Sequence, residues 1–185
     1  MIAENLGFYL FEEQFAENIF LPLFYTEPKR WAFHSQLFFL HEKAAQLAKI
    51  KELLKSTDVV QGCPIEQDYR SYAKAQKILG YISPKEFLLY EQFYDSLNKN
   101  LPQPDLIIQL DASLTALVSR ITGRDRSYER NIDVDYLQTL ITLQDDWLVK
   151  HPKKVLRINT DELDLSQNKE QQKKFINLVK ERLIG

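Results

Sequence analysis

Four short, mainly apolar runs along the chain have the length and composition of β-strands. They show little of the apolar–polar alternation that marks a strand with one wet face. Continuous apolar character is typical of strands covered on both faces of a parallel sheet. We therefore predict a parallel sheet buried between helices. The runs are residues 8–11, 58–61, 106–110 and 155–158.

Longer stretches with helical character separate these strands. The best defined begins with Ser83, a suitable N-cap, and continues with Pro84 at the first helical position, where the missing N–H costs no hydrogen bond. Strands that alternate with helices are typical of α/β proteins with right-handed crossovers. At 185 residues, the chain is expected to form a single domain over residues 1–185. The predicted helices cover residues 31–54, 83–101, 113–121, 134–150 and 168–184.

Composition narrows the class of protein. A hydrophobic fraction of 44% and a charged fraction of 27% are typical of soluble globular proteins. The net charge of -2 argues against a nucleic-acid-binding surface, so any anion site must be local. No apolar run approaches the ~20 residues of a membrane span, and the first residues lack the pattern of a signal peptide. The lone Cys63 excludes an internal disulfide. We expect a cytoplasmic protein with no nucleic-acid or membrane partner.

Polar residues gather where the predicted strands end. In open parallel sheets the ligand crevice lies beyond the carboxyl ends of the strands. Glu12 and Glu13 follow the first strand, and a carboxylate there could take a proton from a substrate hydroxyl. Two adjacent acids are more often a helix cap or a solvated turn, so both interpretations stay open. Residues 62–64, Asp111 and residues 159–161 follow the other strands.

The stretch "SRITGRDRSYER", residues 119–130, holds four arginines and no lysine. Planar guanidinium groups suit phosphate oxygens, and a cluster of them stabilises charge on a transferring phosphoryl group. Arg120 and Arg124 are four residues apart and share a helix face, and Arg126 follows Gly123 in a predicted loop. The alternative is a solvated helix end with ion pairs to acids. The position after a buried strand favours an anion site.

Two aromatic residues and one amide residue occur near the start of the longest predicted helix. Tyr25, Trp31 and Gln36 lie in one apolar neighbourhood. An aromatic ring can stack on a nucleobase, and an amide can read its edge with one donor and one acceptor group. By composition alone, packing of these aromatics into the core is the simpler interpretation.

Other chemistries lack a supporting pattern. His34, His41 and His151 show no metal-ligand spacing with the lone Cys63, so no metal ligand is predicted. No G-x-S-x-G is present to support a hydrolase. No G-x-G-x-x-G is present to support a dinucleotide fold.

In their order along the chain, these segments resemble the deoxynucleoside kinase family. The similarity runs through "FEEQFAENIFLPLFYTEPKRWAFHSQLFFL", "VVQ", "LPQPDLIIQLDAS", "RITGRDRSYERNIDVDYL" and "VLRINTDELDL". The resemblance implies a P-loop kinase-like, doubly wound α/β domain around a five-stranded parallel sheet. It also implies transfer of the γ-phosphoryl group of ATP, with Mg²⁺, to the 5′-hydroxyl of a deoxynucleoside in nucleotide salvage.

The resemblance assigns substrate-binding roles to five residues. Tyr25 and Glu129 match the pair that holds the 3′-hydroxyl of the sugar. Trp31 lines the base pocket, and Gln36 and Asp68 match the residues that hydrogen-bond the base. An amide and a carboxylate can serve purines or pyrimidines, so the preferred base stays open.

The resemblance also assigns catalytic and ATP-binding roles. Glu13 matches the carboxylate that acts as general base on the 5′-hydroxyl. Arg120, Arg124 and Arg126 match the lid arginines that grip phosphates. Arg120, Arg124 and Asp161 are the expected ATP contacts, with Asp161 in the loop near the adenine.

The chain departs from the family pattern in two places. No G-x-x-x-x-G-K-[ST] loop occurs, and "MIAENLGF" resembles the last turns of the helix that follows it, so we expect the first, central strand to be absent from this chain. Residues 62–64 read "GCP" where the family commonly has an acid, an arginine and a serine that serve Mg²⁺ and the 5′ end of the substrate. Phosphoryl transfer depends on positioning and electrostatics, so catalysis by this chain is expected to be impaired.

Three interpretations follow. The first is a deoxynucleoside kinase with ATP and Mg²⁺ as cofactors. The second is a non-catalytic nucleoside-binding or assembly subunit on the same scaffold. The third is an unrelated α/β protein in which every residue named above is structural. A homodimer is expected by resemblance, with residues 38–54 as a candidate surface. Without a central strand, two buried strands would each lose a hydrogen-bonded neighbour. We therefore expect one of three outcomes: closure of the two halves of the sheet, a strand donated by another chain, or marginal stability.

Overall fold

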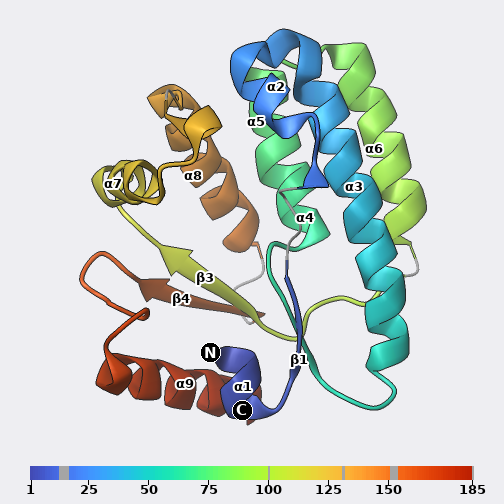
Figure 1. The fold of residues 1–185 in the computed structure, drawn as a ribbon. Coiled ribbons are helices and arrows are strands. Elements are labelled where there is room, and N and C mark those ends of the chain that lie inside the picture. Colours follow the sequence, from blue (N-terminus) through green and yellow to red (C-terminus); the bar gives the residue numbers. More distant parts are fainter. Residues whose placement is uncertain (13–16, 100, 131, 151–153, 185) are drawn as a thin grey trace.

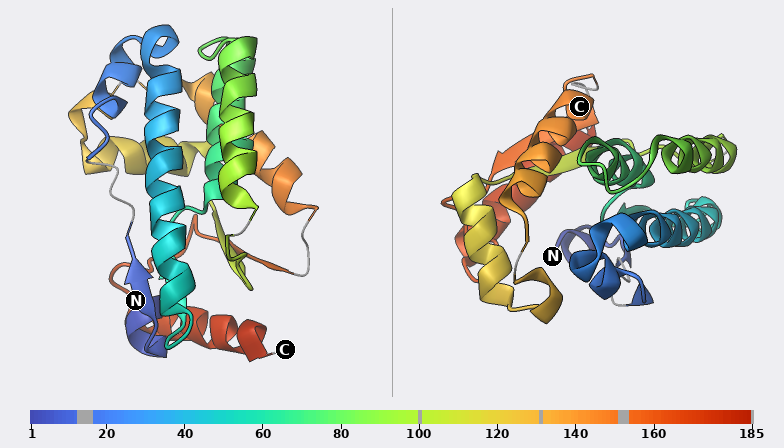
Figure 2. Two further views of the ribbon diagram at one scale, coloured as in Figure 1. Left: turned by 90° about the vertical axis from the view of Figure 1, so that its right-hand side faces the viewer. Right: turned by 90° about the horizontal axis from the view of Figure 1, so that it is seen from above.

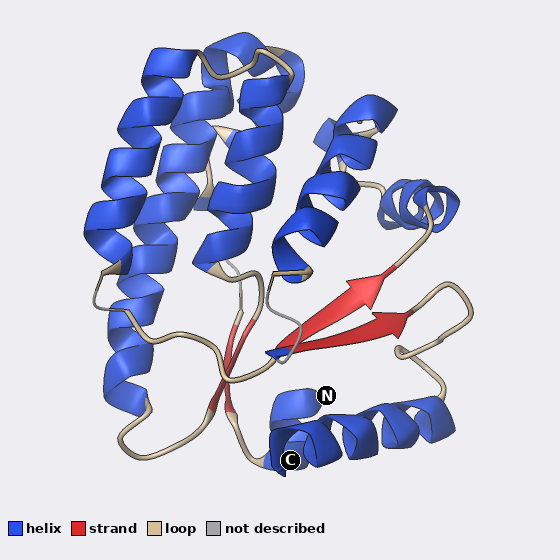
Figure 3. Ribbon diagram, turned by 180° about the vertical axis from the view of Figure 1, so that it is seen from behind, coloured by secondary structure: helices blue, strands red, loops and turns tan. Residues whose placement is uncertain are grey.

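A computed structural model describes residues 1–12, 17–99, 101–130, 132–150 and 154–184 (Figure 1). Most helices lie above the carboxyl ends of the strands, and a last helix lies below them with the first short helix (Figures 1 and 3). Seen from above, the long helices of the first half of the chain lie on one side, and α7 (Leu114–Arg124) and α8 (Val134–Leu148) lie on the other (Figure 2). Within the described ranges, no helix is both long enough and apolar enough to cross a membrane.

The strands begin and end within one residue of the predicted runs. They are β1 (Tyr9–Phe11), β2 (Val59–Gln61), β3 (Ile107–Asp111) and β4 (Val155–Asn159). β1 pairs with β2 and β3 pairs with β4, and both pairs are parallel. The prediction of parallel strands is confirmed.

The two pairs do not join into one sheet in the part of the chain that the structure describes. The strand order is β1–β2 in one pair and β3–β4 in the other. Every strand residue is half-buried or exposed, and Leu10 and Leu110 are 45% and 51% exposed. Strands in a parallel sheet are normally buried on both faces. Of the expected outcomes for the sheet, direct closure of the two halves is therefore not what the structure shows.

The helices form where the sequence predicts them, with additional short ones after β1 and β2. α3 begins at Pro28, which suits a first helical position, and its buried face packs against α6 and the π-helix η2. The Ser83 hydroxyl accepts a hydrogen bond from the Glu86 amide, and the Glu86 carboxylate accepts one from the Ser83 amide, so α6 has the expected N-cap. The helices are α1 (Ile2–Leu6), α2 (Leu21–Thr26), α3 (Pro28–Leu53), α4 (Ile65–Gln67), η2 (Asp68–Ala73), α5 (Lys74–Ile78), α6 (Pro84–Asn98), α7 (Leu114–Arg124), the 3₁₀ turn η3 (Ser127–Glu129), α8 (Val134–Leu148) and α9 (Lys169–Ile184).

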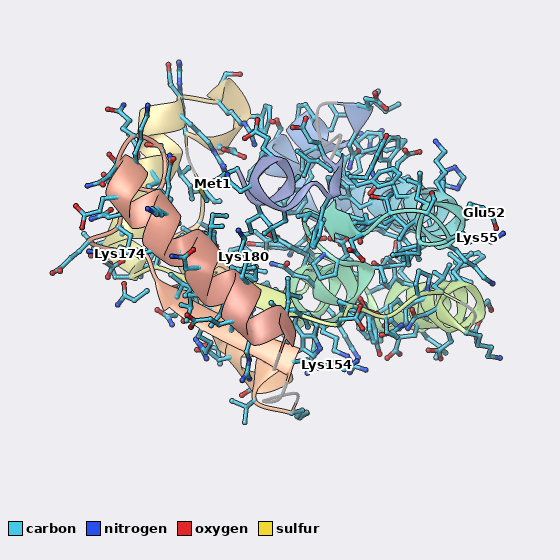
Figure 4. All side chains as sticks on the ribbon, turned by 90° about the horizontal axis from the view of Figure 1, so that it is seen from below. Met1, Glu52, Lys55, Lys154, Lys174 and Lys180 are labelled. Atoms are coloured by element: carbon cyan, nitrogen blue, oxygen red, sulfur yellow. The ribbon has the colours of Figure 1, made fainter. Side chains whose placement is uncertain are left out.

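Two hydrophobic clusters stabilise these layers. The larger one lies among α3, α5, α6 and α8 and includes Leu40, Ile82 and Tyr90. The smaller one joins Phe175 and Val179 of α9 to the lower face of β3 and β4 and to α1. Viewed from below, α9 crosses this face with exposed lysines along it, Lys174 and Lys180 among them (Figure 4).

Candidate active site

Gln36 and Asp68 are buried polar residues on two elements that pack together. Gln36 on α3 is 4% exposed, and Asp68 at the start of η2 is 3% exposed. The Oε1 atom of Gln36 has no hydrogen-bond partner in the described part of the chain. The Cys63 thiol donates to Asp68 Oδ1 at 3.5 Å. A π-helical turn such as η2 is frequent at functional sites, so this pair suits recognition of a polar ligand.

Further buried hydroxyls in this region lack hydrogen-bond partners. Ser71 Oγ on η2 and the Tyr90 hydroxyl on α6 have none among the described residues. Burial raises the pKa of Tyr90 well above its usual value, and the neighbouring carboxylate of Asp68 raises it further. An unpaired buried polar group costs about 1–3 kcal/mol, so a ligand or ordered water is expected to meet these atoms.

The aromatic residues near the start of α3 pack on one another. Trp31 is half-buried, with its ring stacked on Phe20 at 5.8 Å between centroids and the Arg30 guanidinium 4.9 Å from its centre. Tyr25 packs against Tyr128 at 5.6 Å between ring centroids. Tyr25 and Trp31 both pack against the larger hydrophobic cluster, as the simpler interpretation of the sequence held.

Glu129 is a buried carboxylate held by two arginines. It is 4% exposed; Arg124 approaches its Oε2 at 2.7 Å and Arg126 its Oε1 at 3.3 Å. Burial raises the pKa of Tyr25 to about 12, and the negative charge of Glu129 contributes to the rise. The ring of Tyr25 contacts that of Tyr128, the residue before Glu129, so the two predicted partners of a sugar hydroxyl lie near each other. The phenol of Tyr25 stays protonated at neutral pH and can donate a hydrogen bond.

Tyr136 on α8 connects the two groups. It is buried, and its hydroxyl accepts a hydrogen bond from Gln76 Nε2 at 3.3 Å. Burial is the main cause of its raised pKa, and both Tyr25 and Asp68 contribute through their charge. The ring of Phe24 contacts those of Tyr25 and Tyr136, at 5.2 and 6.1 Å between centroids, and α8 packs against η2, where Asp68 lies. The elements that carry the two groups therefore pack on one another.

The lid arginines divide into two sets. Arg124 and Arg126 contact Glu129, whereas Arg120 donates to the hydroxyl of Thr160, at 2.8 Å, and to its carbonyl oxygen. The Thr160 hydroxyl in turn donates to the Asp111 carbonyl oxygen at 2.8 Å, so α7 is tied to the loop after β4. Asp161 in that loop accepts a hydrogen bond from the Ser113 amide at the N-terminus of α7, at 2.8 Å.

Glu13, the predicted general base, lies outside the described residues, so its role stays a prediction. Among the residues that the structure describes, no group of three or more His, Cys, Asp or Glu side chains is placed to hold a metal ion. Residues 62–64 contain no carboxylate. Because Mg²⁺ is usually held by one or two carboxylates together with nucleotide phosphates, its binding stays a prediction.

Two surface hollows lie elsewhere. One, of about 330 Å³, is lined by Ile78, Leu143 and polar residues of α8. The other, of about 390 Å³, lies beside Tyr81 and the start of α3. Neither is lined by Gln36, Asp68 or Glu129. A ligand site needs convergent polar groups, and neither hollow is lined by the residues assigned to the ligand. The candidate site is therefore defined by its buried polar groups and not by either hollow.

Sequence reasoning missed Lys43 and Tyr90. Lys43 is 1% exposed, and its ammonium donates to the Cys63 carbonyl oxygen. Lys43 is seven residues from Gln36, so both lie on nearly the same face of α3. This spacing could have identified Lys43 from the sequence. No sequence signal marks Tyr90, because a tyrosine in an amphipathic helix is expected to pack in the hydrophobic core.

Solved structures of a kinase share this α/β fold. Structures of deoxyadenosine kinase from M. mycoides superpose with TM-scores of 0.81 (with bound dATP) and 0.79 (with bound dCTP). Both are 24% identical in sequence, and each comparison covers 97% of this chain and 89% of the other. At this identity the likeness shows the fold alone.

Sequence comparison identifies the family. The chain matches the deoxynucleoside kinase family over residues 1–184. It is 30% identical to a deoxyguanosine kinase of Bacillus subtilis (strain 168), over all of this chain and 89% of that protein. It is 29% identical to a deoxyadenosine kinase of Lactobacillus acidophilus, over 99% of this chain and 88% of that protein. The chain belongs to the deoxynucleoside kinase family.

Proposed function

We propose that the chain binds a deoxynucleoside among α3, η2 and α8. The observation that carries this proposal is the buried Oε1 of Gln36, which has no hydrogen-bond partner among the described residues. The helix α3, which carries Gln36, packs against α2, which carries Tyr25, and α2 contacts the turn η3, which carries Glu129. In this arrangement Gln36 and Asp68 hydrogen-bond the base, and Trp31 lines its pocket. Tyr25 and Glu129 hold the 3′-hydroxyl. The names of the relatives support a deoxynucleoside as the ligand.

The proposed reaction transfers a phosphoryl group from ATP. The 5′-oxygen forms a bond to the γ-phosphorus, the bond from that phosphorus to the bridging β–γ oxygen breaks, and ADP leaves. Glu13 accepts the hydroxyl proton, and Arg120, Arg124 and Arg126 stabilise charge on the phosphoryl group. Asp161, beside the N-terminus of α7, is proposed near the adenine. The product is a deoxynucleoside monophosphate for salvage in the cytoplasm.

We propose that transfer by these 185 residues alone is slow. The sequence contains no Gly-rich phosphate loop, whose backbone amides cradle ATP phosphates in P-loop enzymes. It also has "GCP" at residues 62–64, where neither Gly62 nor Cys63 supplies a charge. The second candidate, a nucleoside-binding subunit without catalysis, is favoured by these same two observations.

A further strand between β2 and β3 would complete the sheet. The half-exposed state of the apolar strands supports this proposal, because such strands are normally covered and paired. The family fold places its first strand there. Thermal melting tests it: a form extended upstream should melt at a higher temperature than residues 1–185. Equal melting temperatures would count against a missing strand.

We also propose a homodimer. Leu89, Phe93 and Leu97 are spaced four residues apart on α6 and are 43%, 43% and 39% exposed, and we call them the α6 stripe. An apolar helix stripe of this kind is typical of a surface that another chain covers. The expected surface at residues 38–54 stays a prediction, and α3, which contains it, packs against α6.

A phosphoryl-transfer assay with radiolabelled ATP tests the reaction. Wild type should convert at least one deoxynucleoside into its monophosphate, and Glu13→Gln should reduce the rate at least about a hundredfold while nucleoside binding persists. Binding without any transfer would favour the non-catalytic alternative. Neither binding nor transfer would refute both.

A further inference from the structure

The two hydrophobic clusters divide the molecule into two units. Phe11 of β1, together with Tyr136 and Leu143 of α8, belongs to the larger cluster. Ile108 of β3 and Leu156 of β4 pack against the smaller cluster, below which α9 lies (Figure 1). We call β1, β2, α8 and the helices from α2 to α6 the upper body, and β3, β4, α1 and α9 the lower body. Each body has its own hydrophobic core.

Three glutamine side chains connect the upper body to the lower body. Gln67, the last residue of α4, donates from Nε2 to Gln144 Oε1 on α8 at 3.3 Å. Gln144 in turn donates from Nε2 to Gln109 Oε1 on β3 at 2.6 Å. Side chains alternate along a strand, so Gln109 meets α8 while its neighbour Ile108 packs toward α9. We call these three half-buried glutamines the amide chain.

A group of charged side chains crosses the same boundary. Arg157 of β4 donates to Asp111 of β3 at 2.7 Å and to Asp145 of α8 at 2.6 Å. These contacts between α8 and the strands below it are polar, like those of the amide chain. Units that meet through a polar boundary can shift relative to each other unless side-chain contacts fix their separation.

The two bodies carry different parts of the proposed site. Gln36 and Asp68, the proposed base contacts, lie on α3 and η2 of the upper body. Arg120, a proposed phosphate contact, donates to the hydroxyl of Thr160, which itself donates to the carbonyl oxygen of Asp111. Thr160 directly follows β4, so Arg120 is tied to the lower body. The separation of the bodies therefore sets the distance from the base contacts to this guanidinium group.

We propose that Gln144 is a positioning residue that fixes the separation of the two bodies and so aligns the nucleoside with the phosphates. This inference rests on the proposed function. Gln144 acts through Gln67, which directly precedes Asp68, and through Gln109. An amide can accept a hydrogen bond from one body and donate one to the other, which an aliphatic side chain cannot do. Phosphoryl transfer depends on alignment, so a small displacement of one body weakens the site.

Calorimetry with two ligands that share one base tests this assignment. The ligands are a 2′-deoxynucleoside and its 5′-triphosphate, each titrated into the full chain. Wild type should bind the triphosphate about tenfold or more tightly, because its phosphates reach Arg120 and the other arginines of the lid. Gln144→Met keeps a similar length and loses both hydrogen bonds. It should keep the affinity for the deoxynucleoside within about twofold and reduce the preference for the triphosphate at least about fivefold.

A rescue variant separates positioning from a purely structural role. Gln144→Glu combined with Gln109→Lys replaces the amide bond between α8 and β3 by an ion pair, leaves the net charge unchanged and should restore most of the preference. Gln138→Met is the matched control, since Gln138 is exposed on the same helix and this variant should bind both ligands as wild type does.

A second single variant decides the question if Gln144→Met does not fold. Gln109→Met removes only the bond to β3 and should reduce the preference for the triphosphate in the same way. The effects of Gln144→Met and Gln109→Met should not add in the double variant, because both break one chain of bonds.

Three results would overturn the assignment. One is a wild type that binds the deoxynucleoside and the triphosphate equally. Another is a preference like that of wild type in Gln144→Met and Gln109→Met. The last is equal weakening of both ligands in these variants with no rescue by the ion pair, which would mean that Gln144 supports only the fold. A wild type that binds neither ligand would instead refute the proposed function itself, so the two failures are distinguishable.

Discussion

At the residue scale, Gln36 combines burial with an acceptor atom, Oε1, that has no hydrogen-bond partner among the described residues. Such an atom costs about 1–3 kcal/mol in the ligand-free protein. Gln36→Leu should therefore raise the melting temperature of the ligand-free chain by a few degrees and weaken deoxynucleoside binding at least about tenfold. Scanning calorimetry and ligand titration measure the two effects.

The control for Gln36 is another buried glutamine of α3. Gln46 Oε1 accepts a hydrogen bond from Gln61 Nε2 at 3.2 Å, so its amide already has a partner. Gln46→Leu should lower the melting temperature and leave nucleoside affinity nearly unchanged. A fall in melting temperature for Gln36→Leu, with affinity intact, would contradict the role given to Gln36.

Glu129 is expected to serve both stability and sugar recognition. Glu129→Gln removes the charge that Arg124 and Arg126 share, and both arginines can turn to water because they are partly exposed. The free energy of unfolding should fall by about 1–3 kcal/mol, measured by urea denaturation. The preference for a 2′-deoxynucleoside over its 2′,3′-dideoxy counterpart should fall about tenfold, because a hydrogen bond to a charged group is replaced by a neutral one.

Asp125→Asn is the matched control for Glu129. Asp125 pairs with Arg130 in the same segment, but the side chains are 65% and 61% exposed. An exposed pair contributes little, so this variant should resemble wild type in both measurements. Equal effects of the two substitutions would mean that Glu129 has no special role.

At the element scale, sequence predicted each strand and each long helix because their signals are local. The apolar run at residues 106–110 predicts a strand, and Ser83 followed by Pro84 predicts the start of a helix, without reference to distant residues. The region from α4 to α5 was not predicted. A π-helix such as η2 has no characteristic period in sequence, and residues 65–78 mix polar and apolar side chains. The pairing of Arg120 with Thr160 was not predictable either, since forty residues separate them.

The α6 stripe provides a test at the same scale. Phe93→Glu places a charge in the centre of this apolar surface and should convert the proposed dimer into a monomer. Light scattering coupled to size-exclusion chromatography measures the mass directly. Val149→Glu, at an exposed apolar residue beyond the end of α8, should leave the mass of wild type unchanged. A wild type that is already monomeric would refute the homodimer.

At the scale of the whole molecule, several buried or half-buried tyrosines link stability to pH. Burial raises the pKa values of Tyr25, Tyr69 and Tyr94 from 10.0 to about 12. As pH rises, the unfolded chain loses these protons before the folded chain does. The free energy of unfolding should therefore stay nearly constant up to about pH 10 and fall between about pH 10 and 12. Urea denaturation at pH 8, 10 and 11 measures this; equal stability at pH 8 and 11 would contradict it.

The sequence predicted the direction of the strands but not the arrangement of the two strand pairs. Strand direction follows from alternation with helices, and both observed pairs are parallel. Whether β2 and β3 are neighbours depends on contacts between residues far apart in the chain. Their separation, and the half-exposed state of apolar residues such as Leu110, came only from the structure.

The central claim is that the helices above the strands hold a deoxynucleoside. Calorimetric titration of residues 1–185 with each of the four deoxynucleosides tests it directly. Saturable one-to-one binding of at least one of them, weakened at least about tenfold by Gln36→Leu, is the predicted result. No heat of binding with any of the four, from a folded protein, would contradict the account.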